Sequence, residues 1–217
     1  MIYLFLHPVE STIITDSFDC LITQLPRGIQ DRILRKKQQK KRESSLLGYT
    51  LLQRALVHYY DTNLDAITFL SSGKPILKLA NQLLSFNISH SRNLVGLVIG
   101  EANTLGLDIE AFRRFDKVEA SFSFFSPVEQ KAILAATSPD WKLIEFWSKK
   151  EALVKAVGGR MFDMAAYTDV RFDKAQWKGN TYQLSCIDYD FEGFIWIASL
   201  VPIDNITIKT IHDLNKM

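Results

Sequence analysis

A long amphipathic helix followed by runs of strand-like sequence occurs twice in this chain, at a spacing of roughly a hundred residues. The segments ESSLLGYTLLQRALVHYY and SPDWKLIEFWSKKEALVKAV both carry apolar residues at helical spacing. The apolar runs NLVGLVIG and GFIWIASL occupy matching places in the two halves. This repetition predicts an α/β (α+β) chain of two similar, pseudo-twofold-related halves, each a small sheet packed with a long helix. We place the halves at 1–103 and 104–217.

The ends of the predicted helices follow from capping residues. Ser44 or Ser45 is the expected N-cap of the first long helix, and Ser138 with Pro139 is expected to begin the second. Gly158-Gly159 would end it, because glycine commonly follows the last helical residue. A shorter helix is expected to open at Ser126-Pro127.

The predicted strands are short apolar runs. LLSFNISHS and LVGLVIGE are separated by a few polar residues and predict a hairpin. SSGKPIL is predicted as a turn, because Gly-Lys-Pro breaks the pattern. The remaining predicted strands are MIYLFL, TLGLDIE, YTDVRFD, TYQLSCIDY and FIWIASLVP.

Composition limits the classes of protein. The chain has 217 residues, 47% of them hydrophobic, which suffices for a full core and argues against disorder. No apolar run is long enough to span a bilayer, and the N-terminus lacks a signal-peptide pattern. Cys20 and Cys186 stand in no metal-binding or disulfide pattern, so we expect buried free thiols. We therefore expect a cytoplasmic protein, without a membrane partner and monomeric.

The positive charge is concentrated in one segment. Residues 27–42 hold eight basic residues and one acid, so the segment carries +7 although the net charge of the chain is only +2. Such a run is most often a solvated helix face, but it could also contact phosphates or an acidic protein. It lacks interleaved aromatic residues, and the rest of the chain is acidic, so we expect no nucleic acid partner.

The strand GLDIE carries two acids, Asp108 and Glu110, two positions apart. Residues two apart on a strand face the same side, so these carboxylates, roughly 7 Å apart along the backbone, could converge on a hard cation such as Mg²⁺. Leu107 and Ile109 would then face the core. From the two acids alone, ordinary surface acids on a half-buried strand remain the favoured interpretation.

Further candidates lie on the second long helix and near two turns. Glu151 and Lys155 are four residues apart on one helical face, a spacing equally typical of a surface ion pair worth roughly 0.2–0.5 kcal/mol. His90, between two serines at a strand end, could donate to a phosphate or bond to backbone. Lys74 in a Gly-Lys-Pro turn could face an anion. Together these groups meet the needs of metal-assisted phosphoryl transfer.

At this point the sequence resembles a known family. GLDIE, SFFSPVEQKAI, FWSKKEALVKAVG and the preceding FNISHS resemble, in order and spacing, the motifs of the 4′-phosphopantetheinyl transferases of the surfactin-synthetase type. The resemblance covers roughly residues 73–159; the segments 1–40 and 165–217 share only the general pattern. It implies two similar α/β halves with an active site at their junction.

The resemblance also implies an activity and roles for named residues. Members of this family move the phosphopantetheine arm of coenzyme A onto a serine of an acyl or peptidyl carrier protein, releasing adenosine 3′,5′-bisphosphate. By motif, Asp108, Glu110 and Glu151 would hold Mg²⁺, or Mn²⁺, against the pyrophosphate. Glu151 would take the serine proton, directly or through a water, and Lys155 would stabilise or protonate the departing phosphate.

The same comparison assigns contacts to coenzyme A phosphates, with two departures. Lys74, Ser89 and His90 would make these contacts. Relatives commonly carry an arginine just before the LLG of the first long helix, where this chain has Ser44 and Ser45. Either Arg42 reaches round to replace it or the contact is lost. Arg160 stands where relatives often have a small residue.

Three alternatives remain open at this stage. Another Mg²⁺-dependent phosphoryl-transfer enzyme could use the same carboxylates, although the chain has no P-loop and no GxGxxG. A non-catalytic module could bind coenzyme A or a carrier protein, which intact candidate catalytic residues argue against. A nucleic-acid binder through residues 32–42 is the least favoured.

Overall fold

The fold is taken from a computed structural model, which describes residues 2–9, 15–69, 74–79, 83–101, 104–164, 167–203 and 206–209. The helices are α1 (Thr15–Thr23), α2 (Arg27–Leu34), α3 (Gln39–Tyr60), α4 (Pro127–Leu134), α5 (Pro139–Val157) and α6 (Met161–Met164), with 3₁₀ turns at Leu64–Ala66 and Val118–Phe124. The strands are β1 (Ile2–Pro8), β2 (Ile67–Phe69), β3 (Pro75–Lys78), β4 (Leu83–Ser91), β5 (Leu94–Gly100), β6 (Leu105–Ala111), β7 (Lys174–Trp177), β8 (Asn180–Cys186), β9 (Gly193–Ser199) and β10 (Ile206–Lys209).

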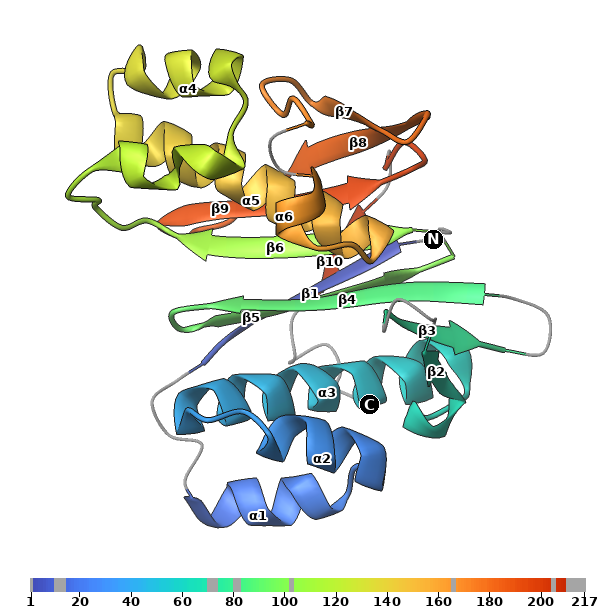
Figure 1. The fold of residues 1–217 in the computed structure, drawn as a ribbon. Coiled ribbons are helices and arrows are strands. Elements are labelled where there is room, and N and C mark those ends of the chain that lie inside the picture. Colours follow the sequence, from blue (N-terminus) through green and yellow to red (C-terminus); the bar gives the residue numbers. More distant parts are fainter. Residues whose placement is uncertain are drawn as a thin grey trace.

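The first sheet has the strand order β10-β1-β5-β4-β3-β2. Its neighbours pair antiparallel, except that β10 runs parallel to β1. Helix α3 packs along one face of this sheet, and α1 and α2 pack on the far side of α3 (Figure 1). Leu51, Leu52 and Leu56 of α3 are fully buried there in one apolar cluster with Phe5 and Phe86 of the sheet.

The second sheet has the strand order β6-β9-β8-β7, all antiparallel. Helix α5 packs on its outer face, with α4 and α6 beside it (Figure 1). Leu143, Phe146 and Leu153 of α5 join Leu184 and Ala198 of the sheet in a second apolar cluster. Each sheet is thus covered by one long helix, as amphipathic helices require.

The two sheets stack directly on each other between the two long helices (Figure 1). A third apolar cluster fills the space between them, with Leu4 and Val98 from the first sheet and Leu107, Ile109 and Ile197 from the second. The predicted α/β class of two sheet-and-helix halves is confirmed. The boundary at 103/104 stays a prediction, since β10 from the end of the chain pairs with β1.

Most predicted elements form where the pattern placed them. The hairpin β4–β5, the strand β6 and the two helices that open with Ser-Pro are present. Ser126 accepts a hydrogen bond from the Glu129 backbone while the Glu129 carboxylate binds the Ser126 backbone, a complete capping box. Helix α5 ends at Gly158, whose positive φ of 71° suits glycine.

Three predictions about local structure are wrong. Helix α3 begins at Gln39 rather than at Ser44 or Ser45, because the preceding Gln, Lys and Arg residues are themselves good helix formers; both serines lie buried inside it. YTDVRFD forms no strand where it is described, and the Val170 amide bonds instead to the Glu129 carboxylate. Pro75 to Leu77 of the predicted turn belong to strand β3, while Ser71 to Gly73 lie outside the described residues.

Cys20 and Cys186 are free, as expected, but both are exposed, so the predicted burial is wrong. None of the helices in the described part of the chain is long and apolar enough to cross a membrane.

Candidate active site

A pocket of about 330 Å³ opens at the junction of the two halves. Strand β4 contributes one wall, β6 the second and α5 the third. The lining residues are Ile88, Ser89, His90, Asp108, Ile109, Glu110, Trp147, Glu151 and Lys155. All the predicted metal ligands and catalytic residues therefore line one pocket, together with two of the predicted coenzyme A contacts.

Strand β6 presents its acids to α5 because its residues alternate between two faces. Leu107 and Ile109 point into the cluster between the sheets, as predicted. Gly106 lies on the opposite face, where a Cβ atom would overlap the backbone of Ala152 and Ala156. The missing side chain lets α5 approach β6 closely, so the acids that follow meet the helix directly.

Asp108 is only 4% exposed and is not the surface acid that alternation alone favoured. Its Oδ1 accepts from Lys155 Nζ at 2.7 Å, and its Oδ2 accepts from Ser148 Oγ at 2.7 Å. Ser89 Oγ lies 3.4 Å from Oδ1. These contacts offset the free-energy cost of burying the Asp108 carboxylate.

Ser148 was not predicted as a site residue, although its spacing contains a usable signal. Positions 148, 151 and 155 are three and four residues apart and therefore share one face of α5. A fully buried serine on the same face as Glu151 and Lys155 is a natural partner for an acid on the facing strand.

The other two carboxylates are half-buried. Glu110 forms an ion pair with Arg113, three residues further along. Burial raises the pKa of Glu151 and the nearby Asp108 raises it further, while Lys155 lowers it. Glu151 and Lys155 are therefore not the solvent-facing pair that their spacing also allowed.

The donor set suits a hard divalent cation, since all three acids offer carboxylate oxygens to one pocket. Lys155 and Arg113 now hold Asp108 and Glu110, so positive charge already accompanies these acids. Among the residues the structure describes, no group of three His, Cys, Asp or Glu side chains converges closely enough to bind a metal as it stands. The residues fit the ion chemically, and the metal site stays a prediction.

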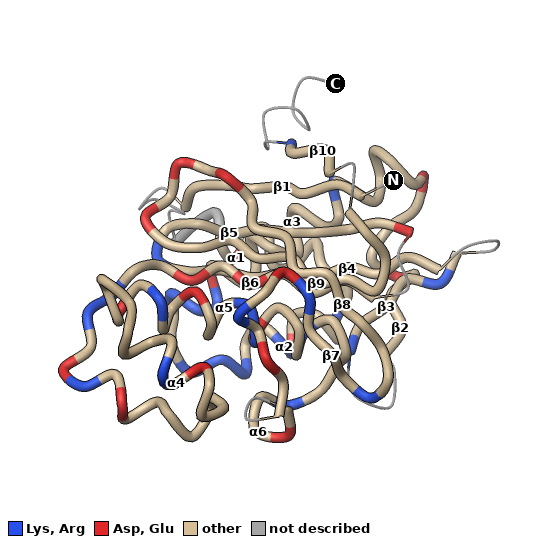
Figure 2. The backbone as a smooth tube through the Cα atoms, turned by 90° about the horizontal axis from the view of Figure 1, so that it is seen from above, with Lys and Arg blue, Asp and Glu red and all other residues tan. Residues whose placement is uncertain are grey.

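A second pocket of about 270 Å³ adjoins the first through Ile88, which lines both. It is basic, with Arg32 and Lys36 on its wall beside Tyr49 and Asn87. Burial lowers the pKa of His90, and Lys36, Lys155 and Lys41 lower it further. In the view of Figure 2 α5 overlies α2, so the lysines and arginines of these two helices overlap there only in projection. Part of the basic run therefore lies on the wall of the pocket that adjoins the acid-lined one.

The structure does not bring Lys74 or Arg42 into the acid-lined pocket. Lys74 is buried, and its Nζ donates to the carbonyl oxygens of Leu105, at 3.3 Å, and Ala156. Arg42 Nε donates to the Lys36 carbonyl at 2.7 Å. Their predicted contacts to coenzyme A stay predictions, as does any role for the exposed Arg160.

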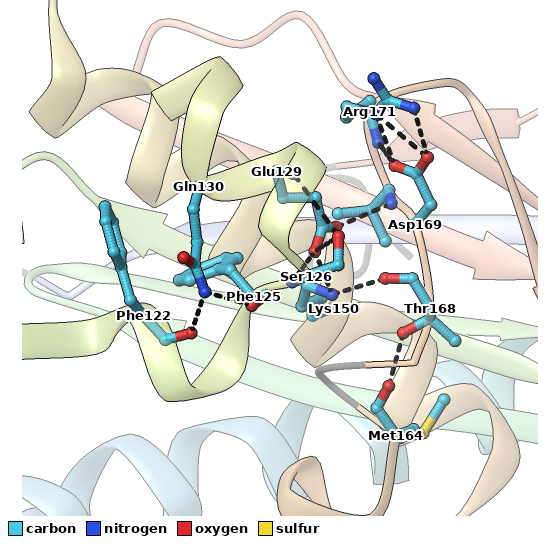
Figure 3. A network of polar contacts seen from close by, with 11 residues as sticks. Phe122, Phe125, Ser126, Glu129, Gln130, Lys150, Met164, Thr168, Asp169 and Arg171 are labelled. Atoms are coloured by element: carbon cyan, nitrogen blue, oxygen red, sulfur yellow. Dashed lines mark hydrogen bonds and ion pairs between the residues drawn. The ribbon is translucent and has the colours of Figure 1, made fainter. Parts of the chain in front are cut away.

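A buried ionic network anchors the side of α5 away from the pocket (Figure 3). Lys150, next to Glu151 in sequence, pairs with Glu129 of α4 at 3.0 Å, and both side chains are almost fully buried. Lys150 also donates to the Thr168 carbonyl at 2.6 Å, and Glu129 accepts from the Val170 amide at 3.0 Å. The network therefore ties α5 to α4 and to the segment after α6.

Comparison with known proteins agrees with this arrangement in both halves. The sequence model of the 4′-phosphopantetheinyl transferase superfamily matches residues 104–206. The model of the 4′-phosphopantetheinyl transferase N-terminal region matches residues 12–102. The two matches together include all the residues that line the acid pocket, while β1 and all but the first residue of β10 lie outside them.

Individual relatives carry the same description. The 4′-phosphopantetheinyl transferase AcpT of Salmonella typhimurium is 30% identical over 68% of this chain and 70% of its own length. The 4′-phosphopantetheinyl transferase gsp of Aneurinibacillus migulanus is 28% identical over 75% of this chain and 68% of its own. The corresponding HetI of Nostoc sp. is 36% identical over 41% and 39%. The chain therefore belongs to the 4′-phosphopantetheinyl transferase superfamily, in its two-half, surfactin-synthetase type, and is a transferase.

Proposed function

We propose that the chain transfers the 4′-phosphopantetheine arm of coenzyme A to a serine hydroxyl of an acyl or peptidyl carrier protein. The transfer would depend on Mg²⁺, or Mn²⁺, and release adenosine 3′,5′-bisphosphate. One observation supports this most directly: Asp108, Glu110, Glu151 and Lys155 line one pocket that adjoins a basic pocket. A pyrophosphate-containing substrate needs acids that can hold a metal ion and cations that can contact its phosphates.

Asp108, Glu110 and Glu151 would hold the metal ion. When bound, the ion supplies positive charge against the pyrophosphate oxygens. Lys155 and Arg113 would then exchange their contacts with the acids for contacts with substrate or solvent. The Ser148 hydroxyl keeps the Asp108 carboxylate oriented towards the pocket.

Glu151 would act as the general base. Its half-buried carboxylate has a raised pKa, which makes it a better proton acceptor than an exposed acid. It would remove the proton from the carrier serine, directly or through a water, as the serine oxygen attacks phosphorus. Lys155 would stabilise or protonate the 5′-phosphate of the departing adenosine 3′,5′-bisphosphate.

The remaining predicted residues would bind coenzyme A. His90 and Ser89 border the pocket and lie near the cations of the basic run, where phosphate groups would be favoured. Lys74 and Arg42 are proposed as further phosphate contacts. We propose a cytoplasmic monomer that needs no nucleic acid or membrane partner.

One assay tests the proposal. The protein is incubated with coenzyme A, Mg²⁺ and an apo carrier protein, and the carrier is then weighed by mass spectrometry. A gain of one phosphopantetheine mass, lost on chelation of the metal, is the expected result. No gain across acyl and peptidyl carriers would contradict the proposal, and coenzyme A binding without transfer would indicate a non-catalytic binding module.

Glu151→Gln provides the residue-level arm of this test. The amide cannot accept the serine proton, so the rate should fall about 10²–10⁴-fold while thermal unfolding stays unchanged. Activity close to that of the unmodified protein would remove Glu151 from the mechanism.

A further inference from the structure

The edge of β6 that faces away from β9 is bound by side chains instead of by another strand's backbone. The amide of Leu107 donates to Asn87 Oδ1 at 3.1 Å, that of Ile109 to Ser89 Oγ at 3.1 Å, and that of Ala111 to Ser91 Oγ at 2.9 Å. All three acceptors lie on β4, in the middle of the other sheet. Besides the apolar layer between the sheets, the free edge of β6 is therefore bound to a row of polar side chains of the first sheet.

The acceptors on β4 and the donors on β6 have the same spacing along their strands. Asn87, Ser89 and Ser91 are two residues apart and share a face of β4, and the three donors are also two residues apart. The row is continued at both ends by cations of the first half. Lys74 donates to the Leu105 carbonyl, and Arg92 donates to the Phe112 carbonyl and pairs with Glu192 at 3.2 Å.

This row lies where it can fix the position of the acids relative to the first sheet, while the pairing of β6 with β9 fixes it relative to the second. Sliding β6 by one residue would turn Asp108 and Glu110 into the apolar layer between the sheets. Sliding it by two would restore the alternation but move Asp108 by roughly 7 Å along the strand. It would also place a side chain where Gly106 now lies against α5, and the helix backbone leaves no room for one.

The row also connects the walls of the pocket. Ser89 Oγ accepts from the Ile109 amide and from Lys155 Nζ, at 3.0 Å, and lies beside Asp108 Oδ1. One hydroxyl therefore contacts β6, α5 and an acid of the site. Asn87 and Ser91 repeat the strand contact on either side of it.

We propose that Asn87 and Ser91, together with Ser89, are positioning residues that set the register of β6 against β4 and thereby hold Asp108 and Glu110 where they face Glu151 in the pocket. Asn87, Ser89 and Ser91 of FNISHS thus align the two halves of the protein across the active site. This inference rests on the proposed function, because it assigns the metal to Asp108, Glu110 and Glu151.

Ser91 allows the cleanest test, because it lines neither pocket. Ser91→Ala removes the acceptor of the Ala111 amide, and Ser91→Thr retains a hydroxyl. Ser185→Ala is the matched control: Ser185 is a half-buried strand serine of β8, and its side chain forms no hydrogen bond with any described residue. Asn87→Ala repeats the test at the other end of the row, should Ser91→Ala not fold.

Three readouts are compared on the full chain. Mn²⁺ binding is measured by electron paramagnetic resonance without substrate, amide exchange of residue 111 by NMR, and carrier modification as kcat and KM. For Ser91→Ala we expect about fivefold faster exchange at Ala111. The Mn²⁺ dissociation constant should rise about tenfold, and kcat should fall with little change in KM for coenzyme A. Ser91→Thr should restore the values of the unmodified protein.

The inference is overturned if folded Ser91→Ala loses stability but binds Mn²⁺ and turns over like Ser185→Ala, since a merely structural hydrogen bond would give that result. If the unmodified protein neither binds Mn²⁺ nor modifies a carrier, the proposed function itself fails. The positioning role then falls with it, although slow exchange at Ala111 would still report the hydrogen bond.

Discussion

Lys74 shows how a single buried residue can serve a role that its sequence context does not reveal. A lysine in a Gly-Lys-Pro segment suggests an exposed cation, yet its Nζ donates to carbonyl oxygens of β6 and α5. Burial lowers its pKa from the usual 10.5 to about 8. A neutral amine still carries two N–H donors, so it can keep both contacts after losing its proton.

The lowered pKa of Lys74 predicts a pH dependence of stability. Below pH 8 the lysine is protonated in both the folded and the unfolded chain, so it does not make the free energy of unfolding depend on pH. Between pH 8 and about 10 the unfolded chain binds the extra proton, so the free energy of unfolding should rise with pH.

Denaturant titrations at several pH values measure this effect against Lys74→Met, which lacks the titrating group. The unmodified protein should gain up to about 1.4 kcal/mol per pH unit relative to the variant over this window. Parallel pH profiles for the two proteins would contradict the burial of a titrating lysine.

At the scale of elements, α5 is the part whose placement matters most. One side of the helix presents Glu151 and Lys155 to the pocket and Ser148 to the Asp108 carboxylate. Its other contacts include the ion pair between Lys150 and Glu129, which reaches α4 and the segment after α6 (Figure 3). Of two adjacent residues on α5, Glu151 therefore lines the pocket, and Lys150 ties the helix to the neighbouring elements.

Breaking the Glu129–Lys150 pair should destabilise the protein strongly. Glu129→Ala leaves the Lys150 ammonium buried without its counter-charge and the Val170 amide without its acceptor. We expect a loss of about 3–5 kcal/mol in the free energy of unfolding, measured by urea titration.

Lys131→Ala, an exposed change on the same helix, should cost less than about 0.5 kcal/mol. The double change Glu129→Gln with Lys150→Met should be milder than Glu129→Ala, because it removes both charges. A loss below about 1 kcal/mol for Glu129→Ala would show that Lys150 finds other compensation.

At the scale of the whole molecule, the two halves share one core. Leu4 and Val98 of the first sheet pack with Leu107 and Ile197 of the second, and β10 returns to pair with β1. Neither half can therefore separate without exposing the apolar layer between the sheets.

This shared core predicts one cooperative unfolding transition. Calorimetry should give a single peak whose calorimetric and van't Hoff enthalpies agree. Leu4→Ala, a fully buried change in the first half, should lower the free energy of unfolding by about 2–5 kcal/mol and shift the whole peak. Two separate peaks, with only one of them moved by the substitution, would contradict a common core.

Local patterns in the sequence were enough to predict both long helices, most of the strands and the residues that share a face at the site. Period-two alternation in GLDIE separates Leu107 and Ile109 from the acids, and the helical spacing of Glu151 and Lys155 places them on one side of α5. Alternation and helical spacing are properties of consecutive residues, so they can be recognised without knowing the partner. The same holds for the Ser-Pro helix starts and for Gly158.

Which of these groups meet could be learned only from the fold. The bond of Ser148 to Asp108, the row from Asn87 to Ser91 along β6, and the burial of Lys74 join residues far apart in sequence. Apart from the Ser148–Asp108 bond, which joins two side chains, these contacts bind side chains to backbone groups of another element, and every residue has the same backbone amide and carbonyl whatever its type. FNISHS can therefore be recognised as a motif from the sequence, whereas its contacts between the two halves are visible only in the fold.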